Sequence, residues 1–179
     1  MKKFNYSSKP AHPRKIQHLM EEFMNEILTS AHIERYAAVR KGHDGFKTFP
    51  YDNDTPIIVI EYDFNDMACN NKASKFFLEY FYSICPWAEI EKVSEVTISL
   101  LHELGHNLTA HKLPKNFNKD EENYLLESQN LPLSQHCMKY FQMKDEKLAT
   151  NWAVKWISQK ENIKIIKDFE KKFFKAWRG

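Results

Sequence analysis

The feature that most constrains this chain is the segment His102-Glu103-Leu104-Gly105-His106. On an α-helix, residues four apart stand on one face, so the rings of His102 and His106 can bind one metal ion while Glu103 lies beside them. This HExxH spacing is typical of zinc-dependent hydrolases, in which three protein ligands leave the fourth zinc position for a water. The sequence therefore predicts a zinc site with His102 and His106 as ligands and Glu103 as the general base.

The segment lies in a stretch with helical periodicity, and residues 89–111 are expected to form one buried helix. Apolar residues recur there at intervals of three or four (Val93, Val96, Leu100, Leu104 and Leu108). A polar stripe runs down the same helix (Glu95, Ser99, His102, Glu103 and His106). Buried polar groups need partners. A bound metal ion would be a partner for the polar side chains of this stripe, so a metal site is the preferred interpretation. A hydrogen-bonded pair of core histidines is the alternative.

The third metal ligand does not follow the HExxHxxGxxH pattern. Thr109 stands where that pattern has Gly, and Lys112 stands where it has the third His, with His111 one residue out of register. A carboxylate from a later helix is therefore expected as the third ligand, because a mononuclear zinc hydrolase binds its metal through three protein side chains.

Glu146 is the preferred candidate for that carboxylate, and Asp145 is the second choice. Glu146 shares a helix face with Ala149, Thr150 and Ala153. A carboxylate is short, so it reaches a metal on another helix only where the two backbones approach closely, and alanines permit such an approach. A solvated surface charge is the alternative interpretation of Glu146.

Composition bounds the remaining possibilities. A chain of 179 residues with 42% hydrophobic content is expected to form a single domain, residues 1–179. The net charge of +2 gives no indication of nucleic-acid binding, and no apolar run is long enough for a membrane span. The three cysteines (Cys69, Cys85 and Cys137) form no CxxC pair. They are expected to be reduced thiols, which indicates a cytoplasmic protein.

The order of predicted elements gives an α+β, helix-dominated fold with a small sheet before the HExxH helix. Residues 1–12 form a flexible lead-in, and helices are expected at 13–31, 71–84, 120–127 and 134–159. Strands are expected at 36–39, 46–51 and 57–64. Residues 161–179 form a basic amphipathic helix, for which an anionic surface or a partner protein is a weaker alternative to simple packing.

These motifs together resemble the ImmA/IrrE-type zinc metallopeptidases of bacteria and their mobile elements. The resemblance covers about residues 57–157 and depends on HELGH and on the pattern Glu146-x-x-Ala149-x-x-Trp152-Ala153. It implies a zincin-like fold and a gluzincin-like Zn²⁺ site with His102, His106 and Glu146 as ligands. Thr150 stands where that family has Asn or Asp, although a hydroxyl can also accept the N–H of a ligand histidine.

The expected function is that of an intracellular zinc metallopeptidase acting on a peptide bond of a protein substrate. Tyr124, His136 and Tyr140 are candidates for stabilising the oxyanion, and residues 57–64 are expected to pair with an extended substrate. The alternative is a protein-binding module of a mobile element or regulatory system that holds zinc structurally, with His111 or His136 as a fourth ligand.

Overall fold

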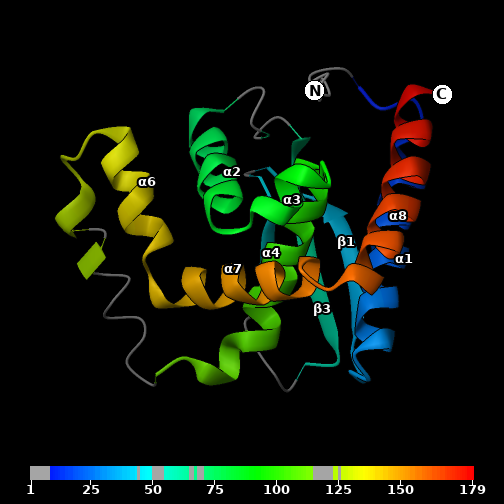
Figure 1. The fold of residues 1–179 in the computed structure, drawn as a ribbon, viewed down its shortest axis with the longest axis horizontal. Coiled ribbons are helices and arrows are strands. Elements are labelled where there is room, and N and C mark those ends of the chain that lie inside the picture. Colours follow the sequence, from blue (N-terminus) through cyan, green and yellow to red (C-terminus); the bar gives the residue numbers. More distant parts are fainter. Residues whose placement is uncertain are drawn as a thin grey trace.

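The structure is a computed structural model that describes residues 9–43, 45–49, 55–64, 67, 71–114, 123–124 and 126–179. It confirms the predicted α+β, helix-dominated class with a small sheet before the HExxH helix (Figure 1). The elements in chain order are α1 (Pro13–Ser30), β1 (Tyr36–Lys41), β2 (Lys47–Phe49), β3 (Ile57–Tyr62), α2 (Lys72–Ile84), α3 (Pro86–Ile90), α4 (Glu95–Thr109), the 3₁₀ turn η2 (Ala110–Lys112), α6 (Leu133–Phe141), α7 (Lys144–Ile157) and α8 (Lys160–Arg178).

The three strands form a mixed sheet in the order β1-β3-β2. β1 pairs in parallel with β3, from Tyr36 opposite Ile57 to Lys41 opposite Tyr62, and β2 pairs antiparallel with β3. The expectation that residues 57–64 pair with a substrate is therefore wrong, because β3 is the central strand, paired with β1 over 57–62 and with β2 over 59–61. The edges of this sheet are β1 and β2.

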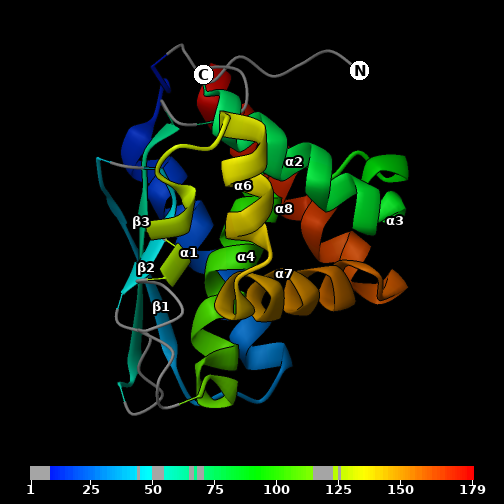
Figure 2. The ribbon, with the colours of Figure 1, turned by 90° about the vertical axis from the view of Figure 1, so that its left-hand side faces the viewer.

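The helices lie against one face of the sheet (Figure 2). Alternate residues of β1 and β3 are buried, as a strand with one covered face requires (Ala37, Val39, Ile58 and Ile60). The predicted first helix is confirmed as α1, and the predicted basic amphipathic helix is confirmed as α8. These two helices pack together, with the Phe23 and Phe169 rings stacked at a centroid distance of 4.3 Å.

The helix that carries HELGH is shorter than predicted. It begins at Glu95 rather than at residue 89, because the Ser94 side chain accepts a hydrogen bond from the Thr97 backbone N–H and caps the helix. The preceding residues form the separate short helix α3, and Lys92 between them adopts a positive φ of 56°. His111 lies beyond the helix, in η2.

The single helix predicted at 134–159 is in fact two helices. α6 ends at Phe141 and α7 begins at Lys144, after extended backbone at Met143 (φ −58°, ψ 149°). No Pro or Gly marks the break. The change of direction lets α6 lie along α2 while α7 crosses α4 (Figure 1).

Several other expectations concern residues that the structure describes only in part. Residues 1–8 of the predicted lead-in, Cys69 and residues 120–122 and 125 of the predicted helix 120–127 lie outside the described residues, whereas 123–124 and 126–128 are helical. Cys85 and Cys137 are free and buried. Among the described helices, none has both the length and the apolar character needed to cross a lipid bilayer.

A buried carboxylate connects α8 to the start of α4. Glu170 Oε1 accepts hydrogen bonds from the Ser94 backbone N–H at 2.6 Å and from the Thr97 hydroxyl at 2.8 Å. The negative charge also lies at the positive end of the α4 dipole. Glu170 thereby fixes the N-terminus of the helix that carries His102 and His106.

Replacing Glu170 with Ala should destabilise the fold by about 2–4 kcal/mol, because two buried donors lose a charged acceptor. Urea unfolding measures the change. Asp168→Ala, on the exposed side of the same helix, is the matched control and should stay within about 0.5 kcal/mol of the parent protein. Equal urea midpoints for Glu170→Ala and Asp168→Ala would contradict the proposal that Glu170 fixes the N-terminus of α4.

Candidate metal centre

Three buried side chains from two helices converge at one point. His102 Nε2 lies 3.0 Å from Glu146 Oε2, and His106 Nε2 lies 3.1 Å from His102 Nε2 and 3.4 Å from Glu146 Oε1. α4 provides the two histidines, one turn apart, and α7 provides the carboxylate. The structure thus brings together the three residues expected as ligands.

The separations between these donor atoms fit a zinc ion. A tetrahedral centre with bonds of about 2.0–2.1 Å has donor-to-donor edges of about 3.3 Å. Here the two Nε2 atoms lie 3.1 Å apart, and the contacts from His102 and His106 to Oε2 and Oε1 of Glu146 are 3.0 and 3.4 Å, respectively. A proton shared between two of these side chains stabilises only one of the three contacts among His102, His106 and Glu146. A single metal ion bound between them stabilises all three. Two imidazoles and one carboxylate are also a donor set that zinc binds.

A hydroxyl positions the ring of the first ligand. Thr150 Oγ1 lies 3.2 Å from His102 Nδ1. In the tautomer that carries its proton on Nδ1, the ring donates to Thr150 and directs the Nε2 lone pair into the cluster, as a metal ligand must. Thr150 comes one helical turn after Glu146, so one face of α7 supplies both a candidate ligand and the group that orients another.

The close approach of α4 and α7 depends on Gly105. A Cβ at this position would lie 2.6 Å from the backbone oxygen of Ala149 and 3.0 Å from its Cα. Ala149 and Ala153 are fully buried, which agrees with the small-residue face expected on α7. Gly105 itself was not predicted as a contact residue, although a glycine between two histidines on a buried helix indicates close packing.

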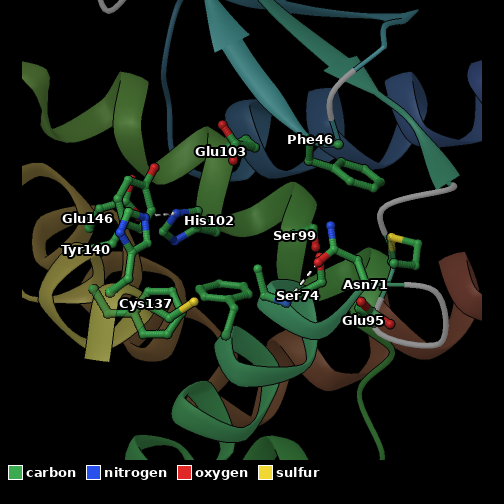
Figure 3. Close-up of a pocket in the computed structure, with 16 residues that line it drawn as sticks. Phe46, Asn71, Ser74, Glu95, Ser99, His102, Glu103, Cys137, Tyr140 and Glu146 are labelled. Carbon is green, nitrogen blue, oxygen red and sulfur yellow. Dashed lines mark hydrogen bonds and ion pairs between the residues drawn. The ribbon is translucent and has the colours of Figure 1, made fainter. Parts of the chain in front are cut away.

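Glu103 lies in the wall of a cavity beside the cluster and is almost completely buried (Figure 3). Burial raises the pKa of its carboxyl from 4.5 to about 8; Glu146 acts in the same direction, while His106, the Thr48 backbone and Lys47 act to lower it. A cation bound in the cluster would favour the ionised carboxylate. Glu103 contributes no atom to the cluster, as expected for a proton acceptor rather than a ligand.

The two neighbouring acids of α7 have different environments. Burial acts to raise the pKa of Glu146, but hydrogen bonds with His102 and His106 outweigh it and hold this pKa well below its usual range. Burial raises the pKa of Asp145, and the Glu146 charge adds to the increase. Asp145 contributes no atom to the cluster, and its Oδ1 has no hydrogen-bond partner among the described residues.

The cavity beside the cluster has a volume of about 370 Å³. Four of the five residues in the polar stripe of α4 line it (Glu95, Ser99, His102 and Glu103), so the stripe faces a cavity rather than apolar core. Its walls come from α2, α6, and the segment before β2, and include Phe46, Phe77 and Phe141. The cavity leads from the donor cluster along α4 toward Glu95 (Figure 3).

Two of the three candidates for stabilising an oxyanion line this cavity, His136 and Tyr140. Tyr124 does not line it, but its hydroxyl lies 2.7 Å from His136 Nε2 and positions that ring. His111 is exposed on η2, and neither His111 nor His136 joins the donor cluster. Within the described part of the chain, His102, His106 and Glu146 are therefore the complete set of His, Cys, Asp and Glu donors at this point.

Comparison with known proteins gives no match to a protein-family model, to a curated protein or to a solved structure. The resemblance to ImmA/IrrE-type metallopeptidases stays a prediction from the motifs.

Replacing Gly105 with Ala should weaken both the fold and zinc binding. Helix propensity alone predicts a gain of about 0.8–1 kcal/mol, whereas the contact with the Ala149 backbone predicts a loss of about 1–3 kcal/mol or more. The sign of the change in the free energy of unfolding therefore shows which of the two effects is larger. A urea midpoint equal to or above that of the parent protein would contradict the close approach of α4 and α7.

Replacing Glu146 with Gln should reduce zinc affinity by more than the roughly 10–100-fold typical of a lost outer-shell partner, because the metal loses a charged ligand. Asp145→Asn is the matched control and should leave the affinity almost unchanged, since Asp145 lies outside the cluster. Competition with a chromogenic chelator measures both. Equal, small effects would mean that the third ligand is another residue.

Proposed function

We propose that this protein is a zinc metallopeptidase that hydrolyses a peptide bond in a protein substrate. The observation that carries the proposal is the buried His102, His106 and Glu146 cluster beside Glu103, at a cavity large enough to admit a side chain. Three protein donors leave a coordination position for water or substrate, whereas structural zinc sites use four. The free, buried Cys85 and Cys137 agree with a cytoplasmic location.

Each residue has a role in hydrolysis. His102, His106 and Glu146 would hold zinc, which when bound would supply polarisation of the scissile carbonyl and a lowered pKa for the attacking water. Glu103 takes a proton from the attacking water and delivers it to the amine nitrogen as the carbon–nitrogen bond breaks. His136 and Tyr140 are the groups in the cavity wall that can donate a hydrogen bond to the developing oxyanion, with His136 oriented by Tyr124.

The substrate backbone is expected to pair with β2. This strand is an edge of the sheet, and the residues just before it, Gly45 and Phe46, line the cavity. The side chain of Asn107 donates to the Thr48 hydroxyl, which in turn donates to the Val59 carbonyl oxygen, so β2 is held against α4. An extended peptide added to this edge would run past Glu103.

The second candidate function is a protein-binding module in which zinc has a structural role. It requires a fourth protein ligand, and His111 and His136 were the candidates. Neither lies in the donor cluster. This observation favours the hydrolase over the binding module.

Glu103→Gln separates the two functions. The variant keeps the size of the side chain but removes the proton acceptor, so hydrolysis should fall about 10²–10⁴-fold while zinc content and fold stay unchanged. Zinc is measured by elemental analysis and cleavage by mass spectrometry of a peptide mixture. A natural substrate should also co-purify with the Glu103→Gln protein.

His102→Ala provides the control for the metal, since it should lose both zinc and hydrolysis. If Glu103→Gln keeps the biological function of the protein while His102→Ala abolishes it, the metal is structural and the metallopeptidase proposal fails. Stoichiometric zinc in a protein that lacks both His102 and His106 would contradict the metal centre itself.

A further inference from the structure

The cavity beside the metal centre has a charged end that hydrolysis does not use. Glu95 lies in the first turn of α4 and lines the same cavity as His102. Ser99 lies between them on that face of the helix, and Asn71 and Ser74 of the facing segment lie near Glu95 (Figure 3). A carboxylate and three neutral polar side chains thus gather at the end of the cavity away from the donor cluster.

The distance from this end to the metal centre corresponds to one long side chain. Glu95 and His102 are seven residues apart on α4, which is about 10 Å along the helix axis. A lysine side chain extends about 6 Å from its Cα along a four-carbon stem. The scissile carbonyl lies one bond of about 1.5 Å from that Cα, and a charge-assisted hydrogen bond adds about 2.8 Å. These lengths together reach about 10 Å.

The chemistry of the cavity matches such a side chain along its whole length. Phe46, Met67 and Phe77 provide apolar walls for a methylene stem, and Glu95 provides negative charge for its end. No Lys or Arg is among the described residues that line the cavity. A neutral apolar side chain of the same length would displace water from beside the carboxylate without supplying charge, which is unfavourable.

We propose that this cavity is a specificity pocket that accepts a lysine or arginine side chain next to the scissile bond, with Glu95 as the residue that recognises its charge. The inference rests on the proposed peptidase function, because the metal centre fixes the position of the scissile carbonyl. Glu95 is a specificity-determining residue here and has no part in the bond-breaking step. The preferred substrates are therefore proteins with an accessible basic residue at the cleavage site.

The test is a binding measurement with two small zinc-directed ligands, the hydroxamates of Nα-acetylated lysine and of Nα-acetylated norleucine. Both carry the same zinc-binding group and nearly the same stem, and they differ in the terminal ammonium. Calorimetry on the zinc-loaded protein should show about tenfold tighter binding of the lysine compound, which corresponds to one charge-assisted contact. In Glu95→Gln this ratio should fall to near one.

Two further variants control for charge and for folding. Glu89→Gln removes an exposed acid of α3 that does not line the cavity, and it should keep the tenfold ratio. Glu95→Asp retains the charge and should keep a preference for lysine. A ratio near one in the parent protein, or an unchanged ratio in Glu95→Gln, overturns the inference.

The outcome is separate from that of the Glu103→Gln experiment, since hydroxamate binding requires zinc but no hydrolysis. A protein that prefers the lysine compound yet cleaves no peptide would overturn the peptidase proposal and keep the charge-selective pocket. A protein that cleaves peptides but shows no preference for the lysine compound would overturn the charge-selective pocket and keep the peptidase proposal.

Discussion

The contact between Gly105 on α4 and the Ala149 backbone on α7 is the constraint on which the site depends. A glutamate side chain spans only a few ångströms, so Glu146 meets two histidines of another helix only because the backbones nearly touch. The same crossing places Thr150 against the His102 ring. One close approach therefore supplies a candidate ligand and the group that orients another, and a single methyl group at Gly105 would separate them.

The elements around this crossing hold α4 at each of its ends and along its side. Glu170 from α8 accepts hydrogen bonds at the N-terminus, and Asn107 near the C-terminus is bonded to Thr48 of β2. The apolar face of α4 is buried in the core. A helix fixed in this way can present Glu95, Ser99, His102 and Glu103 to a cavity without rotating, which both the proposed hydrolysis and the proposed charge selection require.

The prediction of the site from sequence depended on local rules that hold in any fold. The i, i+4 spacing put His102 and His106 on one helix face, and the small residues after Glu146 indicated a close helix contact. The metal ligand set was proposed without knowledge of the fold, and the structure brings those three residues together. The predicted helix boundaries were less accurate, because the Ser94 cap starts α4 later than the periodic pattern indicated and the break after Phe141 carries neither Pro nor Gly.

The helix-dominated α+β class, the strands and the polar stripe of α4 could be predicted before the fold was known, because hydrophobic periodicity and residue spacing indicate each of them. The three-dimensional packing determined that β3 is central and β2 is an edge, because strand order depends on long-range pairing that no local pattern records. It also decided that the stripe faces a cavity with Glu95 at one end and the donor cluster at the other. Residues from α2, α4, α6 and α7, from the segment before β2 and at Met67 form that cavity, and their meeting is a property of packing rather than of any one stretch of chain.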